Sequence, residues 1–357
     1  MPLFKSDLPT PALLVDLDAF EANLARLAGA AKAAGKKLRP HAKAHKCVEI
    51  SRRQIAAGAC GICVATVPEA EMMAHAGVPG LLLTSPLADP LKITRLVSTG
   101  AMAVVDHIRQ VQWYQEAACT ANVQVPLLVD LDVGDHRTGA ASTEQAVEIA
   151  LAIDQASHLW LRGVQAYSVS GSHGKDTAER ALLSGHAFQL AAEACRAMAA
   201  HGLHTDTISG GSTGTWDVDL AISEVTELQA GSYPLMDLAY QKLGVDFAPA
   251  MTVMATVVSA NHADFVTVDA GFKAFSTDRT FGPEPVAMPG AVYRWGGDEF
   301  GYLFYKTNPY KTNSRLGSRI EFFPPHCDPT VNLYDRIYAC RGNQVEEVWP
   351  VMDRLRL

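Results

Sequence analysis

Residues 125–168 read VPLLVDLDVGDHRTGAASTEQAVEIALAIDQASHLWLRGVQAYS, and this stretch decides the fold. Two β-type runs, VPLLVDLD (125–132) and LRGVQAYS (161–168), lie at its ends. Between them, STEQAVEIALAIDQA places apolar residues at helical spacing, and Ser142 with Gln145 has the spacing of a capping box. The stretch therefore predicts a strand–helix–strand unit.

The same alternation runs from residue 37 to about residue 235. The other strand candidates are KLRPHA (37–42), GICVAT (61–66), GLLLTS (80–85), AMAVVD (101–106), DTISGG (206–211) and ELQAGSY (227–233). Eight strands that alternate with helices predict an α/β fold, a (β/α)8 TIM-type barrel. A doubly wound sheet is the main alternative, but its GxGxxG fingerprint is absent.

The sequence outside this region has a different texture. TPALLVDLDAFEANLARLAGAAKA (10–33) predicts one extra strand and an amphipathic helix, with Asp18 as N-cap and Glu21 after it. After about residue 240, β-like runs such as TVMATVVSA, FVTVDAG, RIEFFPP and RIYACR follow one another without a long amphipathic helix. We therefore expect a barrel domain at 12–238 and a mostly β domain formed by 1–11 and 239–357.

Composition limits the function. The chain has 357 residues and a formal net charge of -8, which argues against non-specific binding of nucleic acid. It shows no signal-peptide or membrane-spanning pattern, and its seven cysteines lack framework spacing, so we expect a cytoplasmic protein without a membrane partner. Cys60 and Cys63 have CxxC spacing but run into an apolar strand, which favours core packing over a redox or zinc site.

Unusual residues follow several of the predicted strands. Lys43 follows the first strand, Arg137 the fifth and Tyr167 the sixth, with His173 shortly after it. SGGSTGT (209–215) follows the seventh strand, and AGSY (230–233) the eighth. Barrel enzymes build their sites where strands end, so these residues predict an active site.

The residue types indicate a cofactor. Glycines and hydroxyls after the last two strands suit a phosphate group. LRPHAKAHKC (38–47) contains five residues that can carry positive charge, and its Lys43 is suited to form a Schiff base. A lysine and a phosphate site at one barrel mouth predict pyridoxal phosphate.

A second constellation lies in FFPPHCDPTVNLYD (322–335). His326 and Asp328 are two positions apart, so on an extended segment both side chains point the same way and Cys327 points opposite. An imidazole and a carboxylate suit a divalent metal with open positions, although a polar loop explains the spacing equally well.

These motifs together resemble a known family. RPHAKAHKC, the Arg137 loop, QAY with His173 six residues after Tyr167, SGGSTG, LQAGSY, DAGFKA and HCDPTVNLYD occur in this order. The chain resembles the D-threonine aldolase and D-serine dehydratase family of fold-type III, alanine-racemase-like pyridoxal phosphate enzymes, over nearly its whole length.

The resemblance implies roles for single residues. Lys43 would be linked to the cofactor, His173 would act as base on the substrate β-hydroxyl, and His326 and Asp328 would bind Mn²⁺, Mg²⁺ or Zn²⁺. The residues implied to contact the cofactor ring or phosphate are Arg137, Tyr167, Ser209, Gly210, Gly211, Ser212, Thr213, Gly214, Gly231, Ser232 and Tyr233.

The resemblance also implies an activity. Aldolases of the family carry H-x-D at the metal pair and dehydratases usually H-x-C, so Asp328 favours an aldolase that cleaves a D-β-hydroxy-α-amino acid to glycine and an aldehyde. A D-serine or D-3-hydroxyaspartate dehydratase and a non-catalytic pyridoxal-phosphate-binding protein remain alternatives. The family commonly has histidines at the positions of Ser168 and Phe300, so we expect the pocket for the substrate side chain to differ from that of other members. A homodimer is expected from the family.

Overall fold

The computed structural model describes residues 2–305 and 316–352, which form two compact units. We call residues 25–43 and 48–231 the barrel unit. The β unit comprises the described residues of 1–24, 44–47 and 232–354. Residues 306–315 and 353–357 of the predicted C-terminal domain lie outside the described residues.

The barrel unit is built on eight parallel strands in the order β3-β10-β9-β8-β7-β6-β5-β4. A parallel bridge between His41 and Cys63 joins the two end strands and closes the sheet. All eight predicted strands and the barrel fold are therefore confirmed. The strands are β3 (Lys37–Leu38), β4 (Ile62–Val64), β5 (Leu81–Leu83), β6 (Met102–Val105), β7 (Val125–Asp130), β8 (Leu159–Ala166), β9 (Thr207–Gly210) and β10 (Glu227–Leu228).

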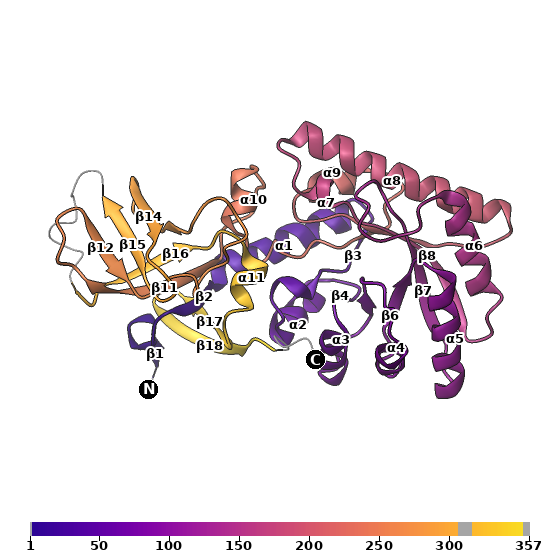
Figure 1. Cartoon of the computed structure of the whole chain (residues 1–357), viewed down its shortest axis with the longest axis horizontal. Helices are drawn as coiled ribbons and strands as arrows, with labels where there is room; N and C mark the ends of the chain where they lie inside the picture. The colour runs from indigo at the N-terminus through magenta and orange to yellow at the C-terminus, as the bar shows by residue number, and fades with distance from the viewer. Residues whose placement is uncertain (1, 306–315, 353–357) are drawn as a thin grey trace. The chain divides into compact units, whose positions relative to one another are not determined.

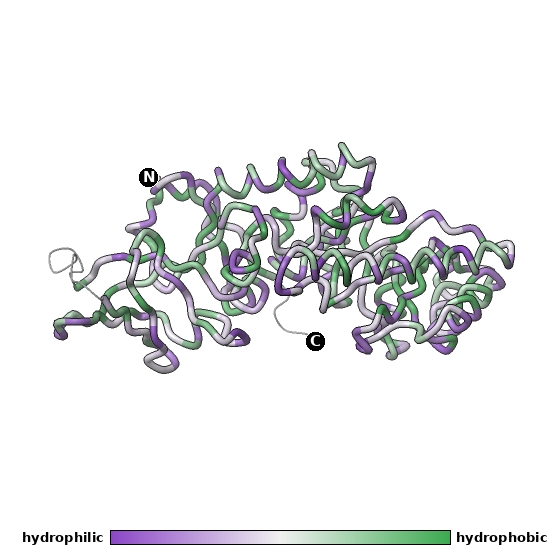
Figure 2. Tube along the Cα trace, turned by 90° about the horizontal axis from the view of Figure 1, so that it is seen from above, coloured by the Kyte–Doolittle hydropathy of each residue, from purple (hydrophilic) through white to green (hydrophobic). Residues whose placement is uncertain are grey.

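Helices lie outside this sheet and alternate with the strands along the chain (Figure 1). Green and purple segments alternate along them in Figure 2, as expected for helices with one buried face. Ser142 caps helix α6 by accepting a hydrogen bond from the Gln145 backbone N–H, as predicted. The helices are α1 (Leu17–Ala33), which continues from the β unit, α2 (Val48–Ala56), α3 (Val67–His75), α4 (Pro90–Val97), α5 (Ile108–Ala121), α6 (Thr143–Asp154), α7 (Val169–Ser172), α8 (Thr177–Ala200) and α9 (Trp216–Ala221).

Side chains from neighbouring strands fill the barrel interior. Cys63, Leu82, Val104 and Leu128 pack together there, and each is almost fully buried. Cys63 is thus a core residue, as its apolar surroundings predicted, whereas Cys60 is exposed, so the prediction of core packing is wrong for it. All seven cysteines are described, and all are free thiols.

The β unit holds a ten-stranded sheet with the path β1-β18-β17-β2-β11-β12-β15-β14, and β16 joins β11 to β13. The predicted β texture after residue 240 is confirmed. The strands are β1 (Leu3–Phe4), β2 (Ala12–Asp16), β11 (Met251–Ser259), β12 (Phe265–Val268), β13 (Glu284–Pro285), β14 (Ala291–Trp295), β15 (Gly301–Tyr305), β16 (Arg319–Phe323), β17 (Arg336–Arg341) and β18 (Gln344–Pro350). Two short helices, α10 (Leu238–Lys242) and α11 (Cys327–Val331), interrupt them.

Two expectations for the N-terminal region need correction. The barrel domain was expected to begin at residue 12, but strand β2 pairs with β11 and β17 and so belongs to the β unit. Helix α1 begins at Leu17, and Asp16 rather than Asp18 accepts the hydrogen bond from the Ala19 N–H, at 3.0 Å. A carboxylate caps the helix, two residues earlier than predicted.

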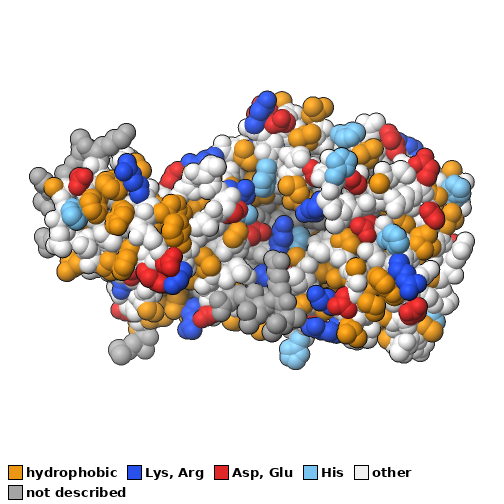
Figure 3. All heavy atoms as spheres, viewed as in Figure 1, with side chains coloured by type: hydrophobic (Ala, Val, Ile, Leu, Met, Phe, Trp, Pro, Cys, Tyr) orange, Lys and Arg blue, Asp and Glu red, His pale blue; other side chains and the backbone are white. Residues whose placement is uncertain are grey.

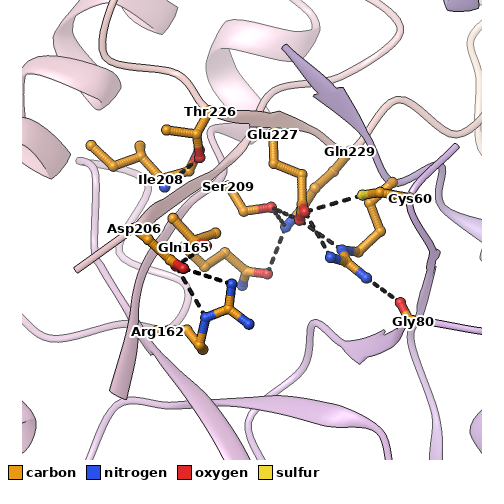
Figure 4. Close-up of polar contacts among 12 residues, drawn as sticks. Cys60, Gly80, Arg162, Gln165, Asp206, Ile208, Ser209, Thr226, Glu227 and Gln229 are labelled. Atoms are coloured by element: carbon orange, nitrogen blue, oxygen red, sulfur yellow. Dashed lines mark hydrogen bonds and ion pairs between the residues drawn. The ribbon is translucent and has the colours of Figure 1, made fainter. Parts of the chain in front are cut away.

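A buried ion pair joins the first and last barrel strands. Arg39 donates from Nε and Nη2 to the two carboxylate oxygens of Glu227, each at 2.8 Å, and it also donates to the carbonyl of Gly80. Glu227 accepts further hydrogen bonds from Ser209 and Cys60, which point toward it in Figure 4. Arg39 of the RPHAKAHK motif therefore links the chain after strand β3 to strand β10 and to the residue before strand β5.

Replacing Arg39 by methionine is expected to lower the free energy of unfolding by about 3–5 kcal/mol, because Glu227 would stay buried without its partner. Urea unfolding measures this loss. The matched control is Arg95→Met, because Arg95 makes the same two-point contact with Glu71, at 2.8 and 2.6 Å, on the surface. The control should cost about 1 kcal/mol or less. Equal losses in the two variants would contradict the assignment.

Candidate active site

Lys43 and Arg137 flank the ring of Tyr167 in the barrel unit. Lys43 Nζ lies 5.8 Å from the ring centroid, and the Arg137 guanidinium carbon lies 5.1 Å from it. The three residues follow strands β3, β7 and β8, so their side chains meet at the carboxyl ends of the parallel strands. The predicted convergence of these residues is present, and it joins two cations to one aromatic ring.

Hydrogen bonds fix the loop that carries Arg137. Thr138 Oγ1 donates to Asp130 Oδ2 at 2.8 Å, and Gln165 Nε2 donates to Asp130 Oδ1 at 2.8 Å. Burial raises the pKa of Asp130 to about 6, in spite of these two donors. Asp135 of the same loop accepts from the backbone N–H of Val169 at 2.5 Å. The Arg137 loop is thereby tied to the segment that follows Tyr167.

That segment contains two predicted residues of interest. Ser168, which replaces a family histidine, caps helix α7 by accepting a hydrogen bond from the Gly171 N–H at 2.9 Å. His173 follows the last residue of α7 and is exposed. Ser168 therefore has a local structural role, and the exposed His173 lies five residues after it in the chain.

The glycine-rich loop between β9 and α9 turns sharply at Gly211. Its φ of 73° is left-handed, and a Cβ there would overlap the carboxylate of Asp219, so the position requires glycine. Asp219 Oδ2 accepts from the Ser212 N–H at 3.2 Å and from Thr215 Oγ1 at 2.5 Å. The buried Asp219 carboxylate thus fixes the loop through these two hydrogen bonds. The Ser209 hydroxyl donates to Glu227 at 2.8 Å, so that side chain is engaged inside the barrel.

Asp219 makes stability depend on pH. Burial raises its pKa to about 7, in spite of hydrogen bonds from Ser184 and Thr215. Its folded-state pKa lies above the unfolded value, so the folded protein binds the extra proton and loses stability as pH rises toward 7. Asp219→Asn should remove the loss of stability that Asp219 causes as pH rises. Urea unfolding at pH 5 and pH 8 should show the variant gaining relative to wild type at the higher pH. Asp154→Asn, at an exposed site at the end of helix α6, is the control, and equal behaviour of both variants would contradict the assignment.

His326 and Asp328 lie together in the β unit, but not for the predicted reason. His326 is the N-cap of helix α11, and Asp328 lies in its first turn, so the segment is not an extended strand. His326 Nε2 is 3.8 Å from Asp328 Oδ2. Cys327 does not point away, because its Sγ donates to the same oxygen at 3.0 Å. The predicted pair is therefore close in space, with a helix N-terminus in place of a strand.

Two further carboxylates and a serine hydroxyl organise this pair. Asp278 Oδ2 lies 2.7 Å from His326 Nδ1, and Arg279 Nη2 lies 3.4 Å from the same nitrogen. The carboxylate only accepts, so in the shorter contact Nδ1 carries the proton, and in a neutral ring Nε2 is then an acceptor or ligand. Asp237 accepts from the Cys327 N–H at 2.8 Å and anchors the start of the helix. Ser232 Oγ donates to Asp328 at 3.2 Å. Sequence reasoning missed Asp278, because it lies 48 residues before His326.

The pair fits a divalent metal. A separation of 3.8 Å is too long for a hydrogen bond and shorter than two ordinary metal–ligand bonds of about 2.1 Å each. A carboxylate behind a ligating histidine is the usual arrangement in metal sites. In the part of the chain that the structure describes, no three His, Cys, Asp or Glu side chains gather into a complete metal site. The remaining positions would be open to water and substrate, as in catalytic sites.

The two units divide the predicted residues between them. The barrel unit holds Lys43, Arg137, Tyr167, His173, the loop 209–214 and Gly231, whereas the β unit holds Ser232, Tyr233, His326 and Asp328. Ser232, which is predicted to contact the phosphate, donates a hydrogen bond from Oγ to Asp328. The barrel residues fit pyridoxal phosphate, because an amine, an aromatic face and a turn that only glycine can adopt follow the carboxyl ends of strands β3, β8 and β9 of one parallel sheet.

Comparison with known proteins extends these observations. The chain matches the family model of the alanine racemase N-terminal domain at residues 15–237 and a putative serine dehydratase domain at residues 250–340. D-threonine aldolase of Arthrobacter sp is 35% identical to this chain, and the match covers 99% of this chain and 94% of the aldolase. 3-Hydroxy-D-aspartate aldolase of Paracoccus denitrificans (strain Pd 1222) is 33% identical, and the match covers 98% of this chain and 93% of that aldolase. The crystal structure of D-threonine aldolase from Filomicrobium marinum has a TM-score of 0.94 at 35% identity, covering 98% of this chain and 97% of that chain.

Fold and matched segments define an alanine-racemase-like enzyme that uses pyridoxal phosphate. Within that class, the chain belongs to the D-threonine aldolase and D-serine dehydratase family and is a lyase. The resemblance that RPHAKAHK and HCDPT indicated is confirmed.

Among the described helices, none has the length and apolar character needed to cross a bilayer. On the face drawn in Figure 3, acidic and basic side chains of the barrel unit are interspersed.

Proposed function

We propose that this chain is a metal-dependent aldolase that cleaves a D-β-hydroxy-α-amino acid, such as D-threonine, to glycine and an aldehyde. The observation that carries the proposal is the pair His326 Nε2 and Asp328 Oδ2, 3.8 Å apart, with Asp278 behind the histidine. A racemase acts only at the α-carbon and has no use for a metal at the β-substituent. The names of the D-threonine and 3-hydroxy-D-aspartate aldolases support the same reaction class.

Most of the residues proposed to hold the cofactor lie in the barrel unit. Lys43 would link to it covalently, Tyr167 and Arg137 would contact its ring, and the loop 209–214 with Gly231, Ser232 and Tyr233 would hold its phosphate. When bound, pyridoxal phosphate supplies an electron sink for the negative charge left on the α-carbon. The exposed cation Arg137, 5.1 Å from the Tyr167 ring, is also placed to attract an anionic substrate.

The β unit would supply the group that acts on the β-hydroxyl. His326 and Asp328 would hold a divalent ion, Mn²⁺, Mg²⁺ or Zn²⁺, whose positive charge favours ionisation of a nearby hydroxyl. His173 would accept the hydroxyl proton, after which the bond between the α- and β-carbons breaks and an aldehyde leaves. The Asp278 carboxylate keeps His326 in the tautomer that this role requires. We further expect a cytoplasmic homodimer.

Metal removal tests the proposal. Incubating the cofactor-loaded enzyme with D-threonine, D-serine and D-3-hydroxyaspartate should give glycine from D-threonine, with turnover lost after chelation and restored by Mn²⁺. Loss of turnover that no divalent ion restores, or full turnover with chelator, would contradict the metal assignment. Keto acid and ammonia as products would identify a dehydratase. A protein that holds the cofactor but turns over none of the three would support the non-catalytic alternative.

A further inference from the structure

A short turn sets the backbone of Lys43. The chain leaves strand β3, forms the bridge between His41 and Cys63, and enters a 3₁₀ turn at Ala42–Ala44. Within this turn, the Lys43 backbone N–H donates to His41 Nδ1 at 3.3 Å. A single 3₁₀ turn has few hydrogen bonds of its own, so an outside acceptor strongly affects where its side chain points.

The second nitrogen of His41 is also engaged. His41 Nε2 lies 3.0 Å from Thr84 Oγ1, and the Thr84 hydroxyl donates its own proton to the Val64 carbonyl at 3.2 Å. Thr84 Oγ1 must therefore accept from His41, so Nε2 carries the proton and Nδ1 is the acceptor that Lys43 requires. His41 is only 8% exposed, so the ring has little freedom to turn.

Thr84 connects this turn to the Arg137 loop. The Thr84 carbonyl accepts from Gln165 Nε2 at 3.0 Å, and Gln165 also donates to Asp130, which holds Thr138 beside Arg137. Gln165 is fixed from its other side by Gln229 Nε2, at 3.2 Å, as Figure 4 shows. A continuous set of buried and partly buried polar contacts thus links the backbone of Lys43 with the loop that carries Arg137.

We propose that His41 is a positioning residue, whose neutral imidazole, held in one tautomer by Thr84, fixes the turn that directs the Lys43 amine. The inference rests on the proposed function, which gives Lys43 its covalent role. His41 itself need not touch substrate or cofactor. It is the acceptor that holds the Lys43 backbone, and Thr84 acts only by setting its tautomer.

The rate of cofactor attachment at Lys43 tests this inference. Wild type and variants are stripped of cofactor, mixed with pyridoxal phosphate, quenched with borohydride at set times, and the Lys43 peptide is measured by mass spectrometry. His41→Ala should slow attachment about 10- to 100-fold. His41→Asn, whose Oδ1 can replace Nδ1 as acceptor, should stay within about 3-fold of wild type. This rescue separates positioning from bulk packing.

Thr84→Val and a matched histidine complete the design. Thr84→Val should slow attachment, and the double variant His41→Ala/Thr84→Val should be no slower than His41→Ala alone. His107→Ala is the control, because His107 Nδ1 accepts from the Arg109 N–H at 3.0 Å in the same way, at the start of helix α5. Its attachment rate should equal that of wild type.

The outcomes separate this inference from the proposed function. An attachment rate equal to that of wild type in His41→Ala would overturn the role of His41. Equal slowing in His41→Asn and His41→Ala would also overturn it. So would a double variant His41→Ala/Thr84→Val in which the two single effects add. If His41→Ala does not fold, His41→Asn and Thr84→Val decide the question. If wild type itself yields no modified Lys43 peptide, the proposed function fails, whatever the His41 variants do.

Discussion

Replacing Lys43 by alanine is expected to abolish covalent attachment of pyridoxal phosphate and to reduce turnover of D-threonine by about 10³-fold or more. The reason is geometric as well as chemical, because Lys43 is the amine that the barrel places beside the Tyr167 ring, 5.8 Å from its centroid. The loss of the visible absorbance of the bound cofactor and of the borohydride-trapped Lys43 peptide measures the first effect. A coupled assay for the aldehyde measures the second.

The control for this variant is Lys37→Ala, which removes an exposed lysine at the start of the same strand. It should keep both the absorbance and the turnover of wild type. Trapping of the cofactor at another lysine in wild type would show that Lys43 is wrongly assigned. Retention of turnover in Lys43→Ala would lead to the same conclusion.

Replacing His326 or Asp328 by alanine is expected to lower turnover by about 10²- to 10³-fold while leaving the cofactor on Lys43. The two residues lie in the β unit and the lysine in the barrel unit, so cofactor attachment and metal binding should be lost separately. Asp278→Asn should weaken metal affinity by about 10- to 100-fold, because the amide no longer fixes the His326 tautomer. Metal titration by calorimetry and the trapped Lys43 peptide measure the two properties independently.

His262→Ala provides the comparison in the same unit, because His262 is an exposed histidine stacked on Phe265. Its metal affinity and turnover should match those of wild type. If His326→Ala and Asp328→Ala bind metal as wild type does, the ligands are assigned to the wrong residues. If they lose the cofactor as well, the separation of the two roles is wrong.

The barrel could be predicted because its strands are short apolar runs, such as GLLLTS (80–85), separated by helices with clear periodicity and caps such as Ser142. The boundary at residue 12 could not. Ala12–Asp16 has the same apolar pattern as a barrel strand, and its partners in β11 and β17 come more than 200 residues later. Local pattern predicts that a strand exists, whereas pairing over such distances decides which sheet it joins.

The candidate site shows the same limit. The sequence identified His326 and Asp328, but their i, i+2 spacing was interpreted on an extended segment. Proline is tolerated in the first turn of a helix, and helix α11 in fact begins at Cys327. Asp278 was not predicted as an orienting group, because a hydrogen bond to a distant loop leaves no spacing in the sequence. His41 was expected as a neighbour that tunes Lys43, but its hydrogen bond to the Lys43 backbone could not be predicted from the sequence.

We propose that the barrel lysine and the metal pair serve one carbon–carbon cleavage. Proton NMR of D-threonine with the cofactor- and Mn²⁺-loaded enzyme is the decisive measurement. We expect glycine and acetaldehyde in equal amounts, matching the D-threonine consumed. Formation of 2-oxobutanoate and ammonia, or of an epimer with the carbon skeleton intact, would contradict it.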